Sequence, residues 1–183
     1  MSRTVSADGP VKIAKFAHFV LRVRNLKASA DWYTKVLGME LVHDAGGKLA
    51  FFTYDDEHHR LALAETPVTA ERVRGAPGLD HVAYTLDSLG DLLSTYKRLK
   101  ALEILPAWPI NHGLTTSLYY EDPDGNRVEF QIENLATKEQ LNSFMKSETF
   151  AANPIGVGFD PEKLLQRYEN GDPEAELLLQ GSA

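Results

Sequence analysis

The sequence predicts an α+β fold, in which two tandem β-α-β-β-β modules form curved, mixed sheets around a metal-containing cleft and a helical C-terminal tail follows. Three observations predict it. A short apolar strand that contains a histidine occurs twice, and its histidines, His18 and His81, are 63 positions apart. Each strand precedes an amphipathic segment with helical spacing, and each half ends in strand-like segments joined by a turn. A single sheet of four strands is marginal alone, so we expect the two copies to pair.

The elements follow one another in the same order in both halves. Strands are predicted at Phe16–Val23 and Leu79–Leu86, helices at Leu26–Leu37 and Ser88–Leu99, and hairpins at Thr53–Leu63 and Tyr119–Phe130. Gly38 is the predicted cap of the first helix. The second hairpin contains Asp122-Pro123-Asp124-Gly125, where proline presets φ and glycine accepts the positive φ that follows.

These elements divide the chain into five segments that form one domain overall. We predict an N-terminal tail at 1–13, a first module at 14–66, a linker at 67–78, a second module at 79–133 and a C-terminal helical extension at 134–183. The linker carries two prolines and two glycines. In the extension, helices are predicted at Lys138–Lys146, Pro161–Tyr168 and Pro173–Leu179, and Asn153–Gly158 is predicted to be irregular. Two roles stay open for the extension: covering the cleft or a partner subunit, or wrapping the outside of a sheet.

Composition excludes several classes of function. The net charge is −7, from 26 acidic against 19 basic residues, and the basic residues form no stripe, so no nucleic-acid partner is expected. The apolar runs are too short to cross a membrane, and the first residues lack the apolar core of a secretory signal, which predicts a cytoplasmic protein. The absence of cysteine excludes disulfides, zinc-thiolate sites and thiol catalysis, which leaves histidine and carboxylate as metal ligands.

Three residues form the predicted metal site. His18 and His81 occupy equivalent positions in the two copies, so pairing of the copies would direct both side chains toward one point. Glu129 lies between Val128 and Phe130 in the last strand of the second copy, and alternation places it opposite these apolar neighbours. The alternatives are two packed histidines and a solvent-facing glutamate. Two imidazoles and one carboxylate form the facial triad of non-haem Fe(II) oxygenases, which leaves roughly three coordination positions open.

A longer motif narrows the prediction. Residues His112–Glu129 contain His-Gly, then Tyr, then Asp-Pro-Asp-Gly-Asn, and end in the candidate ligand Glu129. The sequence resembles the vicinal oxygen chelate superfamily over about residues 14–133, and within it a single-domain form of the type I extradiol ring-cleaving dioxygenases. The better-known enzymes of this type carry two such double-motif domains, so substrate choice does not follow from the resemblance.

The resemblance implies an Fe(II)-dependent extradiol dioxygenase that opens a catechol-type aromatic ring with O2, with Mn(II) as the alternative metal. It assigns His59, from the pair His58-His59, to the dioxygen side of the metal, and it assigns His112 and Tyr119 to hydrogen bonds with the bound catecholate. These three would be the catalytic residues, and no organic cofactor is implied. His58 and His43 are interpreted as structural. Superfamily members are often dimers, so the resemblance also implies a homodimer.

Competing functions stay open. A glyoxalase-like isomerase needs a fourth ligand, but alignment of Arg60 with Arg127 places Ala62 where Glu129 lies in the second copy. A fosfomycin-type thiol transferase shares the three ligands but would not need His59 and Tyr119. A drug-binding resistance module uses the same fold without catalysis. Candidate pocket walls, which core packing explains equally well, are Trp108, Pro109, Ile110, Phe150 and Phe159.

Overall fold

Each half of the chain folds into the order of elements that the repeat predicts. The structure, a computed structural model, describes residues 9–67, 73 and 75–183. The first module comprises β1 (Phe19–Val23), α1 (Leu26–Leu37), β2 (Glu40–Asp44), β3 (Leu49–Thr53) and β4 (Leu61–Glu65). The second module comprises β5 (His81–Thr85), α2 (Leu89–Ala101), β6 (Trp108–Asn111), β7 (Thr115–Glu121) and β8 (Arg127–Glu133). The extension adds α3 (Lys138–Met145), α4 (Glu148–Ala152), β9 (Val157–Gly158), α5 (Pro161–Glu169) and α6 (Glu174–Leu177).

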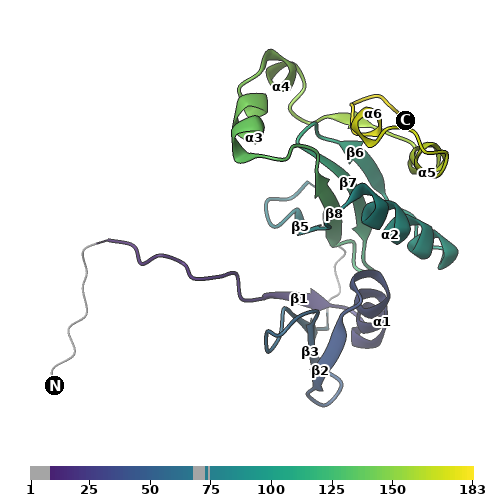
Figure 1. Cartoon of the computed structure of the whole chain (residues 1–183). Helices are drawn as coiled ribbons and strands as arrows, with labels where there is room; N and C mark the ends of the chain where they lie inside the picture. Colours follow the sequence, from purple (N-terminus) through teal and green to yellow (C-terminus); the bar gives the residue numbers. More distant parts are fainter. Residues whose placement is uncertain (1–8, 68–72, 74) are drawn as a thin grey trace.

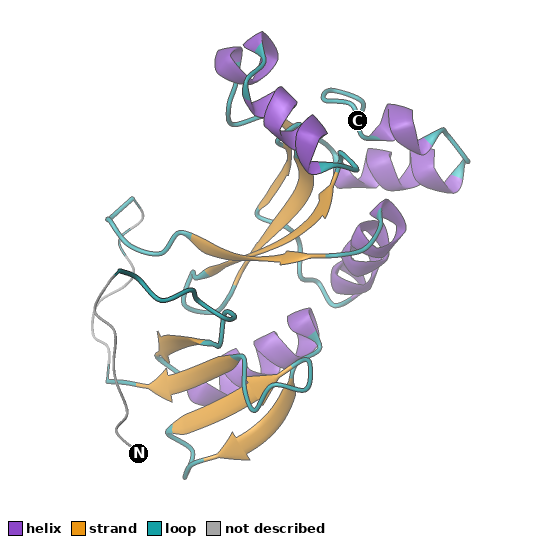
Figure 2. Cartoon of the chain, turned by 60° about the vertical axis from the view of Figure 1, so that its left-hand side comes forward, coloured by secondary structure: helices purple, strands orange, loops and turns teal. Residues whose placement is uncertain are grey.

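The two sheets share one topology. Their strand orders are β1-β4-β3-β2 and β5-β8-β7-β6, and β9 extends the second sheet beyond β6. The first strand of each module runs parallel to the last, and the other neighbours are antiparallel. Figures 1 and 2 show the sheets as separate layers, each with a helix packed on one face. The α+β fold with two mixed sheets is therefore confirmed.

Local sequence signals set the ends of the two module helices. The Asn25 side chain accepts a hydrogen bond from the backbone N–H of Ala28 at the start of α1, and Ser88 does the same for Asp91 in α2. Such caps contribute about 1 kcal/mol each. Gly38 ends α1 with a φ of 66°, in the left-handed region that glycine adopts without strain, as predicted.

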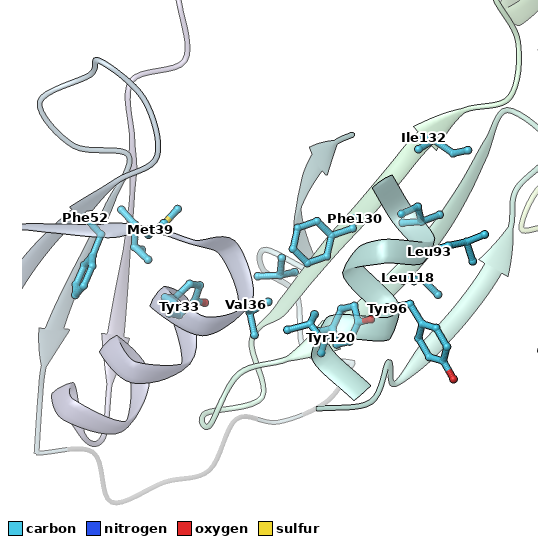
Figure 3. Packing of buried hydrophobic residues seen from close by; sticks show 14 of the residues in the cluster. Tyr33, Val36, Met39, Phe52, Leu93, Tyr96, Leu118, Tyr120, Phe130 and Ile132 are labelled. Carbon is cyan, nitrogen blue, oxygen red and sulfur yellow. The ribbon is translucent and has the colours of Figure 1, made fainter. Parts of the chain in front are cut away.

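The hydrophobic core lies between each sheet and its helix, and it continues from one module to the other. Leu61 and Leu63 of β4 and Leu118 of β7 are fully buried, and each contributes about 1.5–3 kcal/mol by leaving water. Figure 3 shows buried side chains of both modules in one cluster, which runs from Phe52 and Val36 of the first module to Tyr120 and Phe130 of the second. The two modules are thus joined through the helical side of their sheets.

The Asp-Pro-Asp-Gly turn between β7 and β8 makes polar contacts across this junction. Asp122 is buried, and its carboxylate accepts hydrogen bonds from the backbone N–H groups of Asp124 and Asn126, which close the turn. The same carboxylate accepts a bond of 3.1 Å from the Tyr33 hydroxyl of α1. Arg24 of the first module contacts Asp124 at 2.5 Å. One turn therefore shapes the hairpin and attaches the first module to it.

The chain before β1 extends away from both sheets (Figure 1). We call residues 9–17 the N-terminal arm; its apolar side chains Val11, Ile13 and Phe16 are 89%, 84% and 62% exposed. The predicted strand Phe16–Val23 begins only at Phe19, because Phe19 pairs with Leu61, the first residue of its partner strand β4. His18 lies immediately before β1. Of the predicted N-terminal tail and linker, residues 1–8, 68–72 and 74 lie outside the described residues.

The extension is helical, as predicted, with two differences. Residues 148–152 form the short helix α4, whose start is capped by Ser147, a signal that sequence reasoning missed. The prediction that Asn153–Gly158 is irregular is wrong for Val157 and Gly158, which pair with β6. Backbone pairing of two residues leaves no periodic signal in the sequence. Within the described ranges, every helix falls short of the length and apolar character needed to span a membrane.

Candidate active site

The last strand of the second module places Glu129 beside His81. Val128 and Phe130 of β8 face the core, so alternation turns Glu129 to the other face of the sheet. There it is only 3% exposed, and its Oε2 lies 3.1 Å from Nε2 of His81. A buried carboxylate is costly unless it is paired. The solvent-facing alternative for Glu129 is therefore wrong.

Asp80 sets the orientation of the His81 ring. Its Oδ2 lies 2.9 Å from Nδ1 of His81, so the other ring nitrogen, Nε2, is the one that faces Glu129. A carboxylate behind a histidine is the usual support of a metal-ligating imidazole. Sequence reasoning missed Asp80, although it directly precedes the candidate ligand His81.

Tyr119 and His112 continue this group. Tyr119 of β7 lies directly opposite Glu129 of β8, and its hydroxyl is 3.1 Å from Nε2 of His112. Burial, followed by the charge of Glu129 and a hydrogen bond to it, raises the pKa of the Tyr119 phenol. The ring of Tyr119 also stands edge-on to that of His81, with centroids 5.1 Å apart. Four side chains that the sequence singles out thus lie in one connected cluster, which we call the carboxylate cluster: His81, Glu129, Tyr119 and His112.

Aromatic packing limits this cluster on one side. The Trp108 ring lies 5.0 Å from that of Tyr119 and 5.9 Å from that of His112, between centroids. Trp108, one of the predicted wall residues, therefore contacts the cluster. Phe150 instead packs against Phe144 of α3, and Phe159 packs against the hydrophobic core.

The first module carries a second group, which we call the histidine cluster: His18, His58 and His59. One ring nitrogen from each lies within 4.8 Å of the others. In the described part of the chain, this is the one group of three potential metal ligands whose ligand atoms lie so close together. The rings of His18 and His59 are 4.2 Å apart. Burial, then the proximity of His18 and His58, lowers the pKa of His59. Sequence reasoning treated His58 as structural, yet the fold places it here.

Within one chain, the predicted metal ligands are divided between the two clusters. His81 and Glu129 are together, whereas His18 lies with His58 and His59 and does not join them in a group of three. His43, predicted as structural, stacks on Phe51 at 6.3 Å instead.

Strand register agrees with the alignment of the two copies. Val20 pairs with Ala62 across β1 and β4, just as Ala83 pairs with Glu129 across β5 and β8. Ala62 is therefore the first-module equivalent of Glu129. It is 2% exposed and carries no ligand atom.

Comparison with known families agrees with this architecture. The model of the Glyoxalase/Bleomycin resistance protein/Dioxygenase superfamily matches residues 15–130. The chain belongs to this superfamily. Both clusters lie within the matched residues.

Curated relatives of this superfamily member include ring-cleaving dioxygenases and lactoylglutathione lyases. The chain is 48% identical over 160 residues to biphenyl-2,3-diol 1,2-dioxygenase 2 of Rhodococcus globerulus, covering 87% of this chain and 84% of the relative. It is 34% identical over 122 residues to lactoylglutathione lyase of Neisseria meningitidis, covering 63% and 88%. An alignment of 160 residues is longer than the part of the chain that precedes residue 134, so the likeness to the dioxygenase includes part of the C-terminal extension.

Solved structures share the fold. A glyoxylase/bleomycin resistance protein/dioxygenase domain from Frankia matches with a TM-score of 0.60 at 21% identity, covering 71% of this chain and 99% of that one. The fosfomycin resistance protein of Listeria monocytogenes matches with a TM-score of 0.53 at 21% identity, covering 70% and 98%.

Proposed function

We propose that this superfamily member is an extradiol dioxygenase, which opens a catechol-type aromatic ring with O2 and uses His18, His81 and Glu129 as the ligands of one divalent metal. The observation that carries the proposal is the buried Glu129 carboxylate, which His81 and Tyr119 both contact on one face of the second sheet. The likeness to two biphenyl-2,3-diol 1,2-dioxygenases of Rhodococcus globerulus, at 48% and 44% identity, supports the reaction type.

The donor set suits a hard or borderline divalent ion. Two imidazoles and one carboxylate favour Fe(II), with Mn(II) as the alternative, over a soft thiophilic metal. Asp80 supports this assignment, because it fixes which nitrogen of His81 is free to bind. When bound, such an ion supplies Lewis acidity toward the diol and reactivity toward O2.

Protein side chains bind the diol and move its protons. His112 and Tyr119 are joined by a hydrogen bond at the edge of the carboxylate cluster, where they can hold a catecholate oxygen. Burial lowers the pKa of His59, which favours the neutral ring, the form that can accept a proton. We assign to it proton transfer on the dioxygen side of the site.

The other functions of the superfamily fit the chain less well. A lactoylglutathione lyase type of isomerase would need a carboxylate from the first module, and the equivalent position holds Ala62. A thiol transferase or a drug-binding module gives no role to the linked pair His112 and Tyr119.

We further propose that the protein works as a homodimer, in which His18 of one copy completes the metal site of the other. The division of ligands between the clusters supports this. His18, Val20 and Ala62 mark the face of the first sheet that corresponds to the face carrying Glu129, and Val20 there is 55% exposed. The exposed apolar side chains of the N-terminal arm provide further surface for a second copy. A cytoplasmic location stays a prediction.

Anaerobic loading with Fe(II), followed by a panel of catechols in air, tests the function. We expect a yellow ring-opened product from cleavage next to the diol. His18→Ala, His81→Ala and Glu129→Ala should each fold, bind metal weakly and lose turnover. A muconic acid product, or a requirement for Fe(III), would overturn the proposed reaction. Full metal content in any of the three variants would remove that residue from the ligand set.

A further inference from the structure

The end of β6, which carries His112 into the carboxylate cluster, is held by the C-terminal extension. Strand β9 pairs with β6 in antiparallel register, Asn111 opposite Val157 and Ile110 opposite Gly158. Gly156 crosses this strand closely: its φ is 111°, and a Cβ built there would lie 2.3 Å from the backbone oxygen of Asn111. Only glycine lets the chain pass at this distance and with this backbone conformation.

Two more contacts from the extension reach the same strand end. Asn111 is 4% exposed, and its side-chain amide donates a hydrogen bond of 2.9 Å to the backbone oxygen of Leu178. The Gln180 side chain donates a bond of 3.0 Å to the backbone oxygen of Asn111. The residue just before His112 is therefore held by two separate parts of the extension.

The close crossing at Gly156 has a direct effect on the His112 ring. It places the backbone oxygen of Ile155 in hydrogen-bond contact with Nδ1 of His112. A carbonyl oxygen only accepts, so Nδ1 must carry a hydrogen. In the neutral ring this leaves the lone pair on Nε2, the nitrogen that lies 3.1 Å from the Tyr119 hydroxyl.

We propose that Ile155 and Gly156 are positioning residues for His112: the extension fixes the tautomer and the orientation of this ring. The single lone pair of Nε2 can then accept a hydrogen from the Tyr119 hydroxyl or, when Tyr119 donates to Glu129, from a bound diol. The effect on turnover rests on the proposed function, whereas the tautomer does not. The extension is then part of the active-site architecture and more than an outer wrap of the sheet.

Two glycines of one segment give a matched pair of variants. Gly156→Ala forces the Ile155 carbonyl to move, because its Cβ would collide with backbone atoms of Asn111 and His112. Gly158→Ala adds the same methyl group two residues later, where the nearest atom is the backbone oxygen of Pro109 at 3.7 Å, an ordinary contact. Both full-length proteins are labelled with ¹⁵N-histidine, and His112→Gln assigns the signals of His112 among the six histidines.

At a fixed pH above 7, we expect wild type and Gly158→Ala to show His112 with a hydrogen on Nδ1 and a lone pair on Nε2. Gly156→Ala should shift His112 toward a tautomer mixture. In the Fe(II)-loaded enzymes, it should also lower kcat for catechol cleavage, on the order of tenfold or more, with a smaller change in KM. Gly158→Ala should match wild type in both.

The tautomer of His112 in the wild-type protein can by itself overturn the inference. The test therefore still decides if Gly156→Ala fails to fold. A hydrogen on Nε2 of neutral His112 in wild type would refute the role of Ile155. An unchanged tautomer and unchanged kcat in folded Gly156→Ala would refute the role of Gly156. If wild type shows the expected tautomer but cleaves no catechol, the proposed function fails while the positioning of His112 stands.

Discussion

The division of the ligands between two clusters leads to a quantitative prediction for mixed dimers. In a twofold-symmetric homodimer, each site takes His18 from one copy and His81 with Glu129 from the other, so a dimer holds two sites. Alone, His18→Ala dimers and Glu129→Ala dimers have no complete site. A mixed dimer of the two variants has one site in which all three ligands are present and one in which His18 and Glu129 are both lost.

The expected recovery follows from this geometry. When the two variants are unfolded, mixed in equal amounts and refolded, random pairing makes half of the dimers mixed, and half of the sites in these are complete. Metal binding and ring cleavage should therefore return to about a quarter of the wild-type values. Tight-binding metal content is measured after gel filtration, so the result does not depend on whether the bound ion supports catalysis.

A second mixture is the control. His81→Ala and Glu129→Ala affect the same module, so every site in their mixed dimers still lacks one ligand, and no recovery is expected. Failure of the first mixture to recover metal binding, while the refolded wild type recovers fully, would refute the assignment of His18 to the partner's site. Recovery in both mixtures would show that His81 and Glu129 do not belong to one half-site.

Three further substitutions test the equivalence of the two modules, the hydrophobic core and one ion pair. Ala62→Glu adds a carboxylate at the first-module equivalent of Glu129. This variant should bind Ni(II) or Zn(II) more tightly in a competition titration and should lose ring cleavage. Near-normal ring cleavage would contradict the alignment of the two modules. Leu118→Ala removes a fully buried side chain behind Tyr119 and should lower the free energy of unfolding by about 2–5 kcal/mol in a denaturant titration, so a loss below 1 kcal/mol would contradict its place in the core. Lys48, and then the backbone N–H of Leu26, lowers the pKa of Glu65 below its ordinary value of 4.5. The Glu65 carboxylate therefore stabilises the fold above pH 4.5, and this stabilisation is lost as the pH falls further. Glu65→Gln should flatten this part of the profile of Tm against pH, and a profile identical to that of wild type would refute the contribution of Glu65.

The fold could be predicted because the same order of strands and helices is encoded twice along the chain. The repeat of His18 as His81, together with apolar residues at helical spacing after each, determines the order of elements in both modules, and the glycine at position 38 marks the end of the first helix. These are local signals, and the structure confirms them with small shifts in the ends of strands. The paired register of Ala62 and Glu129 was also predictable, because the two arginines at 60 and 127 align the copies.

Other features depend on contacts between distant segments. The crossing of Gly156 over β6 joins residues that are more than forty positions apart, and a two-residue strand has no periodic signature. The meeting of His58 with His18 depends in the same way on how a hairpin tip folds back beside β1. The sequence predicts which side chains carry chemistry, but it does not show which of them one chain brings together.

The buried Asp122 carboxylate has a consequence for assembly. Through its hydrogen bond with Tyr33 and the turn that it closes, it links α1 of the first module to the hairpin of the second, and it thereby helps to hold the angle between the two sheets within one copy. In the proposed dimer, the same angle determines whether a second copy can meet both sheets and close the assembly. A looser junction would let each copy bind a different neighbour, and head-to-tail chains of protein would then compete with the closed pair. A single aspartate in a turn would thereby favour an assembly of finite size.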